Sequence, residues 1–75
     1  MNTVEIVIPT FNEELNIEEL YQKISTLIVK EKNYKFKILF IDNCSTDNTQ
    51  NILKNLANNN QDVKLIFNIK TKHND

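Results

Sequence analysis

Two short clusters of polar residues carry most of the groups that could do chemistry in this 75-residue sequence. The first cluster is "PTFNEE" (9–14), and the second is "DNCSTD" (42–47). Carboxylates, hydroxyls and amides of these kinds can cap a helix, hold a metal ion or accept hydrogen bonds from a ligand. Each cluster directly follows an apolar run, so its side chains are expected at the end of a strand.

Cysteine and histidine chemistry is disfavoured by the counts of these residues. Cys44 is the single cysteine and His73 the single histidine, so neither an internal disulfide nor the paired spacing of a zinc site is available. A nucleophilic or redox thiol also needs a nearby base or a second thiol. We therefore expect neither a catalytic thiol nor a zinc site, and Cys44 is expected to be a small, partly buried thiol. A lone cysteine also favours the reducing cytoplasm.

Composition and charge narrow the classes of protein further. Hydrophobic residues make up 40% of the sequence and charged residues 25%, which is typical of a globular domain. The net charge of -1 gives no reason to expect nucleic acid as a partner, and no run approaches the roughly 20 apolar residues of a membrane span. Glycine is absent, which excludes glycine-rich phosphate loops. Any phosphate binding would have to use helix N-termini and side chains.

Apolar runs alternate with helical periodicity along the chain. The runs predict strands at 3–9, 36–42 and 63–68, the first of them buried on both faces. Apolar residues three and four positions apart predict a helix that begins at Ile17 and another over about 47–58. Such alternation predicts a parallel sheet with right-handed crossovers and strand order 3-2-1. The fold class is thus α/β, with a three-stranded β-α-β-α-β unit over residues 1–68 and an irregular tail over 69–75.

Both helix starts carry residues that suit caps. Asn16 and Glu19 stand three residues apart, as do Asp47 and Gln50, and each pair fits a capping box. Asn12 is an alternative, earlier cap for the first helix. The Asn-rich stretch after the second helix is expected to supply left-handed backbone in place of glycine.

The predicted topology places both polar clusters at one edge of the sheet. In open α/β sheets ligands bind beyond the carboxyl ends of the strands, and neighbouring strands would bring the clusters to face each other across one crevice. Asp42, with Glu13 or Glu14, could accept hydrogen bonds from a nucleobase and a ribose. Free N–H groups at the two helix starts would favour a diphosphate. The alternative is that the short polar side chains only cap helices: Asn12, Ser45, Thr46 and Asp47.

The two motifs resemble the start of the family 2 glycosyltransferases. "IVIPTFNEE" and "ILFIDNCSTDNT", each followed by a helix, are similar to family patterns close to "VSIVIPxYNEE" and "IIxVDDGSxDxT". The resemblance covers about residues 3–68, and both motifs stand in the family's order and separation. Within the family, "NEELNIEEL" is most similar to the polyprenyl-phosphate branch, the dolichol- or undecaprenol-phosphate sugar synthases.

This resemblance implies a GT-A fold, whose N-terminal part is a Rossmann-like nucleotide-binding unit. Glu13 would contact base or ribose, and Asp42 would approach the base. Two positions depart from the family pattern, because Asn43 replaces the second acid and Cys44 replaces a glycine. Cys44 is therefore expected to need backbone angles that glycine takes more easily. The full set of nucleotide-binding residues that the resemblance implies is Pro9, Thr10, Asn12, Glu13, Asp42, Asn43 and Ser45.

The implied activity is transfer of a sugar from a UDP- or GDP-sugar to an acceptor such as polyprenyl phosphate, with Mg²⁺ or Mn²⁺ bound in the complete enzyme. The family's metal-binding DxD motif and its catalytic base lie beyond a third strand like this one. The 75-residue chain is therefore expected to be a truncated fragment that holds no metal and is inactive alone. The full-length form could associate with a membrane, and uncovered sheet edges in the fragment are expected to promote self-association.

A different class of function is also open. A small α/β module could bind a nucleotide or a protein without catalysis, or the chain could be a non-functional remnant. A receiver-like signalling domain is a further variant, since Asp42 ends a strand as a phosphoacceptor would. That variant lacks the paired acids expected directly after the first strand.

Overall fold

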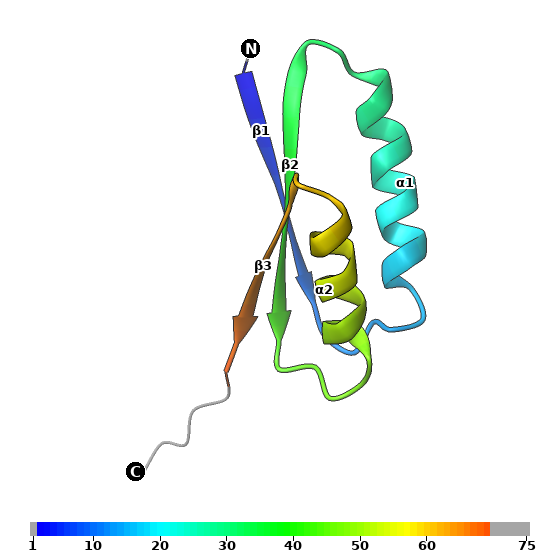
Figure 1. The fold of residues 1–75 in the computed structure, drawn as a ribbon, viewed down its shortest axis with the longest axis vertical. Helices are drawn as coiled ribbons and strands as arrows, with labels where there is room; N and C mark the ends of the chain where they lie inside the picture. Colours follow the sequence, from blue (N-terminus) through cyan, green and yellow to red (C-terminus); the bar gives the residue numbers. More distant parts are fainter. Residues whose placement is uncertain (1, 70–75) are drawn as a thin grey trace.

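One parallel three-stranded sheet carries two helices on the same side (Figure 1). The computed structural model describes residues 2–69. Strand β2 is central and pairs in parallel with both β1 and β3, so the predicted strand order and the predicted α/β class are confirmed. Apart from Ile69, the predicted tail lies outside the described residues, as does His73. The elements, in chain order, are β1 (Asn2–Thr10), α1 (Ile17–Lys30), β2 (Tyr34–Asn43), α2 (Thr49–Asn59) and β3 (Val63–Asn68).

Strand register brings the strand ends together at the carboxyl edge. Thr10 lies opposite Asp42, which in turn lies opposite Phe67. One residue further on, Asn43 lies opposite Asn68. Polar side chains from all three strands are therefore neighbours at this edge.

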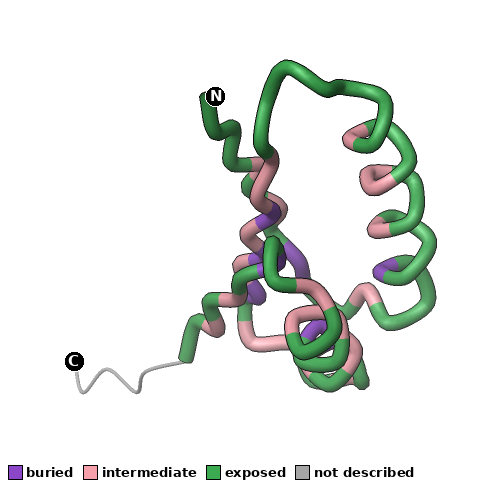
Figure 2. Tube along the Cα trace, turned by 45° about the horizontal axis from the view of Figure 1, so that its top comes forward, coloured by how far each residue is buried: buried purple, intermediate pink, exposed green. Residues whose placement is uncertain are grey.

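The core lies between the sheet and the helices and is small. Phe40 and Leu53 are fully buried, and Figure 2 shows the buried positions gathered where the strands pass beneath the helices. The buried hydrophobic residues are Ile17, Ile38, Phe40, Leu53 and Val63.

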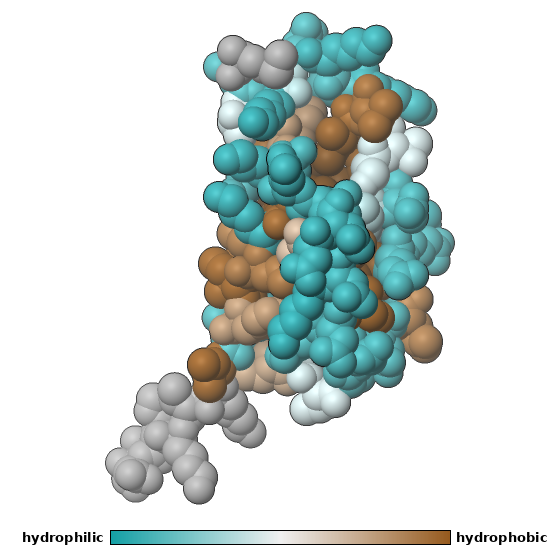
Figure 3. Space-filling view, in the orientation of Figure 1, coloured by the Kyte–Doolittle hydropathy of each residue, from teal (hydrophilic) through white to brown (hydrophobic). Residues whose placement is uncertain are grey.

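The prediction that the first strand is buried on both faces is wrong. Ile6 and Ile8 are half-buried, whereas Val7, which points to the opposite face, is 51% exposed. β1 is an edge strand, and both helices lie on one side of the sheet, so its other face meets solvent. Figure 3 shows hydrophobic atoms at the surface on the side away from the helices. Self-association through uncovered sheet surfaces stays a prediction.

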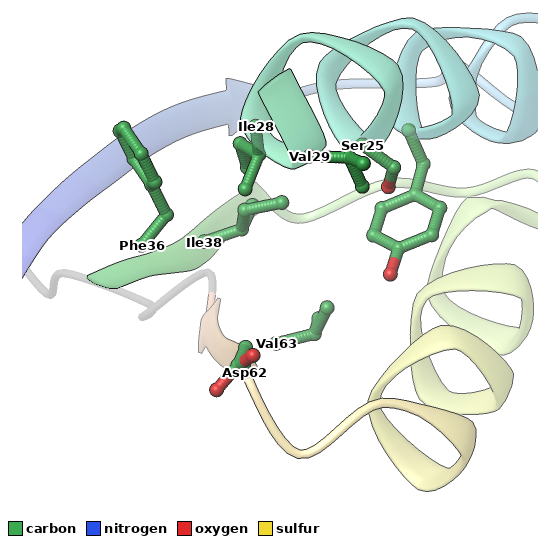
Figure 4. A pocket seen from close by; sticks show the side chains of 8 residues that line it. Ser25, Ile28, Val29, Phe36, Ile38, Asp62 and Val63 are labelled. Atoms are coloured by element: carbon green, nitrogen blue, oxygen red, sulfur yellow. The ribbon is translucent and has the colours of Figure 1, made fainter. Parts of the chain in front are cut away.

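Helix α1 is loosely packed on the sheet. A cavity of about 210 Å³ lies between α1, β2 and the start of β3, and Figure 4 shows Ile28, Val29 and Phe36 at its wall. A second cavity of about 180 Å³ lies between α1 and β1, and Ile28 and Phe36 line both. These two side chains are therefore incompletely packed, because each faces both cavities.

Neither predicted capping box forms. Asn16 occupies the N-cap position of α1 without a side-chain cap, and its amide donates to Glu13 instead. Helix α2 begins at Thr49, two residues later than predicted. Asp47 still accepts a hydrogen bond from the Thr49 N–H, but the Gln50 side chain donates to Asp42 rather than back toward Asp47. The Gln50 amide thus bonds to the buried Asp42 carboxylate and does not complete a capping box with Asp47.

Candidate functional site

The two polar clusters meet as predicted, in direct hydrogen-bond contact. Loop 1 (residues 11–16) joins β1 to α1, and loop 2 (residues 44–48) joins β2 to α2. Side chains of each loop bond to backbone groups of the other, so the loops touch rather than lie on two sides of an open crevice. The contact forms at the carboxyl edge, where β1 and β2 end side by side (Figure 1).

The Asp42 carboxylate is the centre of this contact. Its side chain is 0% exposed, which corrects the prediction that it faces a crevice. The Thr10 hydroxyl donates to Oδ1 at 2.7 Å, and the Ser45 hydroxyl donates to the same oxygen at 2.6 Å. Oδ2 accepts the Ser45 N–H and the Gln50 side-chain amide, each at 3.0 Å. A buried charge is tolerated only when it is so satisfied, and these four bonds tie the ends of β1 and β2, loop 2 and the start of α2 to one point.

Hydrogen bonding also sets the charge state of Asp42. Burial raises the pKa of its carboxyl group, but the bonds from Ser45, Thr10 and Gln50 outweigh burial and bring the pKa below its ordinary value. Donors aimed at an ionised carboxylate favour the charged form. Asp42 is therefore a buried anion at neutral pH, which is unlike an exposed phosphoacceptor.

The side chain of Asn12, in loop 1, also holds loop 2 in place. Its side-chain Oδ1 accepts the N–H of Thr46 at 2.8 Å and the N–H of Asp47 at 3.3 Å. Asn12 itself has φ 50, a left-handed conformation that asparagine tolerates better than most residues. The prediction that Asn12 caps the first helix is wrong, because Asn16 holds the N-cap position of α1 and the Asn12 side chain bonds instead to backbone N–H groups of loop 2.

Three backbone N–H groups of loop 1 already donate to side chains of loop 2 and α2. Those of residues 12, 13 and 14 donate to Ser45 Oγ, Thr49 Oγ1 and Asp47 Oδ2, at 2.8, 2.7 and 3.3 Å respectively. The Asp47 carboxylate also accepts the Thr49 N–H; desolvation raises its pKa, and these hydrogen bonds lower it to a net value below the ordinary one. The amides expected to hold a diphosphate are thus committed to side chains, and an anion would have to displace them.

Beside the buried centre, an exposed pair of amides ends β2 and β3. The Asn68 side-chain N–H donates to Asn43 Oδ1 at 2.6 Å. The Cys44 thiol donates to the Asn68 carbonyl at 3.0 Å, and Cys44 has φ 58, as expected for a residue in a glycine position. Asn68 was not among the residues predicted for the site, because its position beside Asn43 depends on the register of β2 and β3.

The predicted site residues divide into a buried and an exposed group. Thr10 and Asp42 are buried, Ser45 is partly buried, and Glu13 is half-buried. Pro9, Asn12 and Asn43 are exposed at the same edge. The structure therefore brings all seven to one end of the sheet, while direct contact of any of them with a nucleotide stays a prediction.

The described residues do not fit a divalent metal. Residues 2–69 contain no group of three or more His, Cys, Asp or Glu side chains placed to hold an ion. The most central carboxylate, Asp42, has both oxygens occupied by internal donors.

Comparison with known proteins settles the family. The family model described as "Glycosyl transferase family 2" matches residues 5–73, which include both loops, all of β2 and β3 and most of β1. This chain belongs to glycosyl transferase family 2. The resemblance drawn from the two motifs is therefore confirmed, and the β-α-β-α-β unit is that of a family 2 member.

Two curated family relatives are similar over much of the chain. A dolichyl N-acetyl-alpha-D-glucosaminyl phosphate 3-beta-D-2,3-diacetamido-2,3-dideoxy-beta-D-glucuronosyltransferase of Methanococcus voltae is 36% identical over 74 residues, covering 96% of this chain and 22% of the relative. An undecaprenyl-phosphate 4-deoxy-4-formamido-L-arabinose transferase of Pseudomonas fluorescens is 33% identical over 57 residues, covering 76% of this chain and 16% of the relative. This family 2 chain thus spans about a fifth of their length, and their names agree with the predicted polyprenyl-phosphate branch. No solved structure gives a significant match.

Within the part of this family 2 chain that the structure describes, neither helix is long and apolar enough to cross a membrane.

Proposed function

We propose that this chain is the nucleotide-sugar-binding segment of a glycosyltransferase. The complete enzyme would transfer a sugar from a UDP- or GDP-sugar to an acceptor such as polyprenyl phosphate. Family membership and the two curated relatives support the reaction class. The observation that carries the proposal is the meeting of loops 1 and 2 at the carboxyl ends of β1 and β2, the position where open α/β sheets bind ligands.

Glu13 is the side chain best held for contact with base or ribose. Its N–H donates to Thr49, and its carbonyl accepts the N–H groups of Asn16 and Ile17. Both backbone groups of Glu13 are therefore fixed, so its half-buried carboxylate is displayed from a rigid position at the start of α1. A carboxylate accepts hydrogen bonds from ribose hydroxyls or from a base N–H.

The buried residues of the site act by positioning in this proposal. Thr10, Asp42 and Ser45 hold the loops, while Pro9, Asn12 and Asn43 form the adjoining surface of the nucleotide site. Acidic side chains gather around the loops, and their charge opposes a bare diphosphate. We therefore assign the Mg²⁺ or Mn²⁺ of the complete enzyme, and its catalytic base, to residues beyond this chain.

Three further parts of the proposal concern the chain as a whole. The 75-residue chain binds a nucleotide but does not transfer sugar by itself. The enzyme acts in the cytoplasm, where a thiol such as Cys44 stays reduced. Any association of the complete protein with a membrane would be made by other segments.

Calorimetric titration of the 75-residue chain with UDP, GDP and a UDP-sugar, with and without Mn²⁺, tests the proposal. The Glu13→Gln variant is expected to weaken binding by about tenfold, because a hydrogen bond to a charged acceptor is replaced by a weaker neutral one. Glu14→Gln is the matched control: it removes the same charge from the next residue, which is exposed, and should change affinity by less than about twofold.

Two results would contradict the proposal. The first is no heat of binding for any of these nucleotides, with or without Mn²⁺, by a chain whose circular dichroism shows an α/β fold. The second is equal loss of affinity in the two glutamine variants, which would reduce the role of Glu13 to overall charge.

A further inference from the structure

An exposed pair of side-chain amides lies at the carboxyl edge of the sheet. Asn43 and Asn68 end neighbouring strands in register, and Asn68 Nδ2 donates to Asn43 Oδ1 at 2.6 Å. The Cys44 thiol donates to the Asn68 carbonyl and so holds the second amide in place from its backbone. Both side chains are exposed, so their remaining polar groups are available to a ligand.

The groups that this pair leaves free include a donor on one residue and an acceptor on the other. With the Asn68 N–H bonded to the Asn43 oxygen, Asn43 presents its NH₂ group and Asn68 presents its carbonyl oxygen. If both amides turn by half a rotation, the bond between them is kept and the two outward groups change places. The pair can therefore present donor beside acceptor in either order, without loss of its internal hydrogen bond.

Uracil and cytosine also differ by an exchange of donor and acceptor, at two neighbouring positions of the base edge. Uracil presents a C4 carbonyl acceptor beside the N3–H donor, and cytosine presents an N4 amino donor beside the N3 acceptor. One orientation of the amide pair matches uracil, and the other matches cytosine. A carboxylate in place of Asn43 has acceptors only, so it would bond to the uracil N3–H and would meet the cytosine N3 lone pair without a donor.

Resting on the nucleotide-binding function above, we propose that the Asn43–Asn68 pair reads the pyrimidine base and accepts UDP and CDP about equally. Phe11 adds a surface that does not discriminate. It directly follows Thr10, the β1 residue in register with Asp42, and its side chain is 56% exposed. Aromatic side chains stack on any base, because every base has a π-face. Asn68 is thereby a specificity-determining residue at the end of β3.

Titration of the 75-residue chain with UDP and CDP tests this assignment, because the two ligands differ only at the base edge. The dissociation constants are expected to agree within about threefold in the unmodified chain. In Asn43→Asp, UDP should bind about tenfold or more tightly than CDP, a factor that one well-aligned bidentate contact to a base can give. In Asn68→Ala, both affinities should fall together.

Asn33→Asp is the matched control, since it makes the same chemical change at an exposed residue just before the opposite end of β2. Its UDP to CDP ratio should equal that of the unmodified chain. Circular dichroism would establish that each variant is folded; because Asn43 is exposed and the Asn68 N–H can donate to a carboxylate equally well, the fold should be kept.

The possible failures are distinguishable. If the unmodified chain binds UDP at least about tenfold more tightly than CDP, the base-reading role is wrong while nucleotide binding stands. The same holds if Asn43→Asp leaves the ratio unchanged. If neither UDP nor CDP binds at about 1 mM, which corresponds to only about 4 kcal/mol of affinity, the inference is wrong, and the proposed function is wrong as well if GDP also fails to bind.

Discussion

The carboxyl edge of the sheet and the underside of α1 are held together in opposite ways. At the edge, loops 1 and 2 are joined by many hydrogen bonds, and none of the buried side-chain polar atoms of residues 2–69 lacks a partner. Beneath α1 lie two cavities, and the side chains of Ile28 and Phe36 line both of them. Val29 and Leu27 on the same helix are 74% and 67% exposed.

This difference shows that the interactions that fix one arrangement of the atoms are not those that supply most of the folding free energy. Polar networks with every member satisfied fix one arrangement of the atoms, and this is what a binding site needs. Apolar burial supplies most of the driving force for folding, and a chain of this length can bury only about 60% of its surface. The arrangement of loops 1 and 2 is thus fixed by more specific interactions than the packing of α1 on the sheet.

The largest effect is expected from removing the buried carboxylate. Asp42→Ala leaves the hydroxyls of Thr10 and Ser45 and the amide of Gln50 without their acceptor, and each buried unpaired donor costs about 1–3 kcal/mol. The free energy of unfolding should fall by about 4 kcal/mol or more, which would unfold a chain of ordinary marginal stability. Urea denaturation followed by circular dichroism measures the change.

Asp62→Ala is the control for this prediction. Asp62 is exposed, and its carbonyl, which the change retains, is the group that pairs with the Ile38 N–H. The effect should stay within about 0.5 kcal/mol, as for most surface changes. A loss below about 1 kcal/mol in Asp42→Ala would show that the loops are held by something other than this carboxylate.

The same substitution, phenylalanine to alanine, made once in the core and once beneath α1 compares how tightly the two regions are packed. Phe40 is 0% exposed, and Phe40→Ala should cost about 3–5 kcal/mol, the range for truncating a fully buried aromatic side chain. Phe36 already faces two cavities, so Phe36→Ala removes fewer contacts and should cost about 1–2 kcal/mol. Unfolding midpoints in urea would measure both, and equal costs would contradict the loose packing of α1.

The change in stability on acidification should come mainly from two carboxylates near the loops, those of Asp42 and Asp47. Because the folded-state pKa values of Asp42 and Asp47 lie below the ordinary aspartate value, the unfolded chain binds more protons in that range. The associated stability is fully present above about pH 4–5, where aspartate is ionised in the unfolded chain. It is lost as the pH falls through the lower folded-state values.

Urea midpoints between pH 7 and pH 3 test this direction. Asp42→Asn cannot ionise, so its curve should start lower at pH 7 and fall less steeply on acidification. If the unmodified chain were most stable near pH 3, the sign would be wrong. A variant curve parallel to that of the unmodified chain would show that Asp42 does not carry the acid sensitivity.

The fold could be predicted from the sequence because its signals are local. Alternation of apolar runs with a helical period places three strands and two helices, and two crossovers of helical length fix a parallel sheet. The burial of β1 could not be predicted this way, since a run such as 3–9 reads alike whether one or both faces are covered. Val7 shows which face of this run stays open.

The roles of the site residues depended on distant partners. That Asp42 would be buried follows from where Thr10 and Gln50 lie once the strands are paired, and no local pattern contains that information. Cys44 was predicted to need left-handed backbone because it stands in a glycine position, and it has φ 58. The Asn-rich stretch was expected to do the same, yet Asn60 has φ -141 because an extended residue leads directly into β3.

The smallest predicted effect is a gain in stability where the packing is loose. Ser25 faces the larger cavity from the middle of α1, and Ser25→Leu would place apolar atoms in space that Ile28, Phe36 and Val63 already line. Leucine also favours the helix more than serine does. We expect a gain of about 0.5–1 kcal/mol in the free energy of unfolding by urea, a common result of filling a cavity.

Ser25→Ala makes most of the helix-propensity gain without filling the space, so a larger gain for leucine than for alanine measures the cavity itself. Equal gains would mean that α1 already closes on the sheet in solution, and the contrast between the two regions would then disappear.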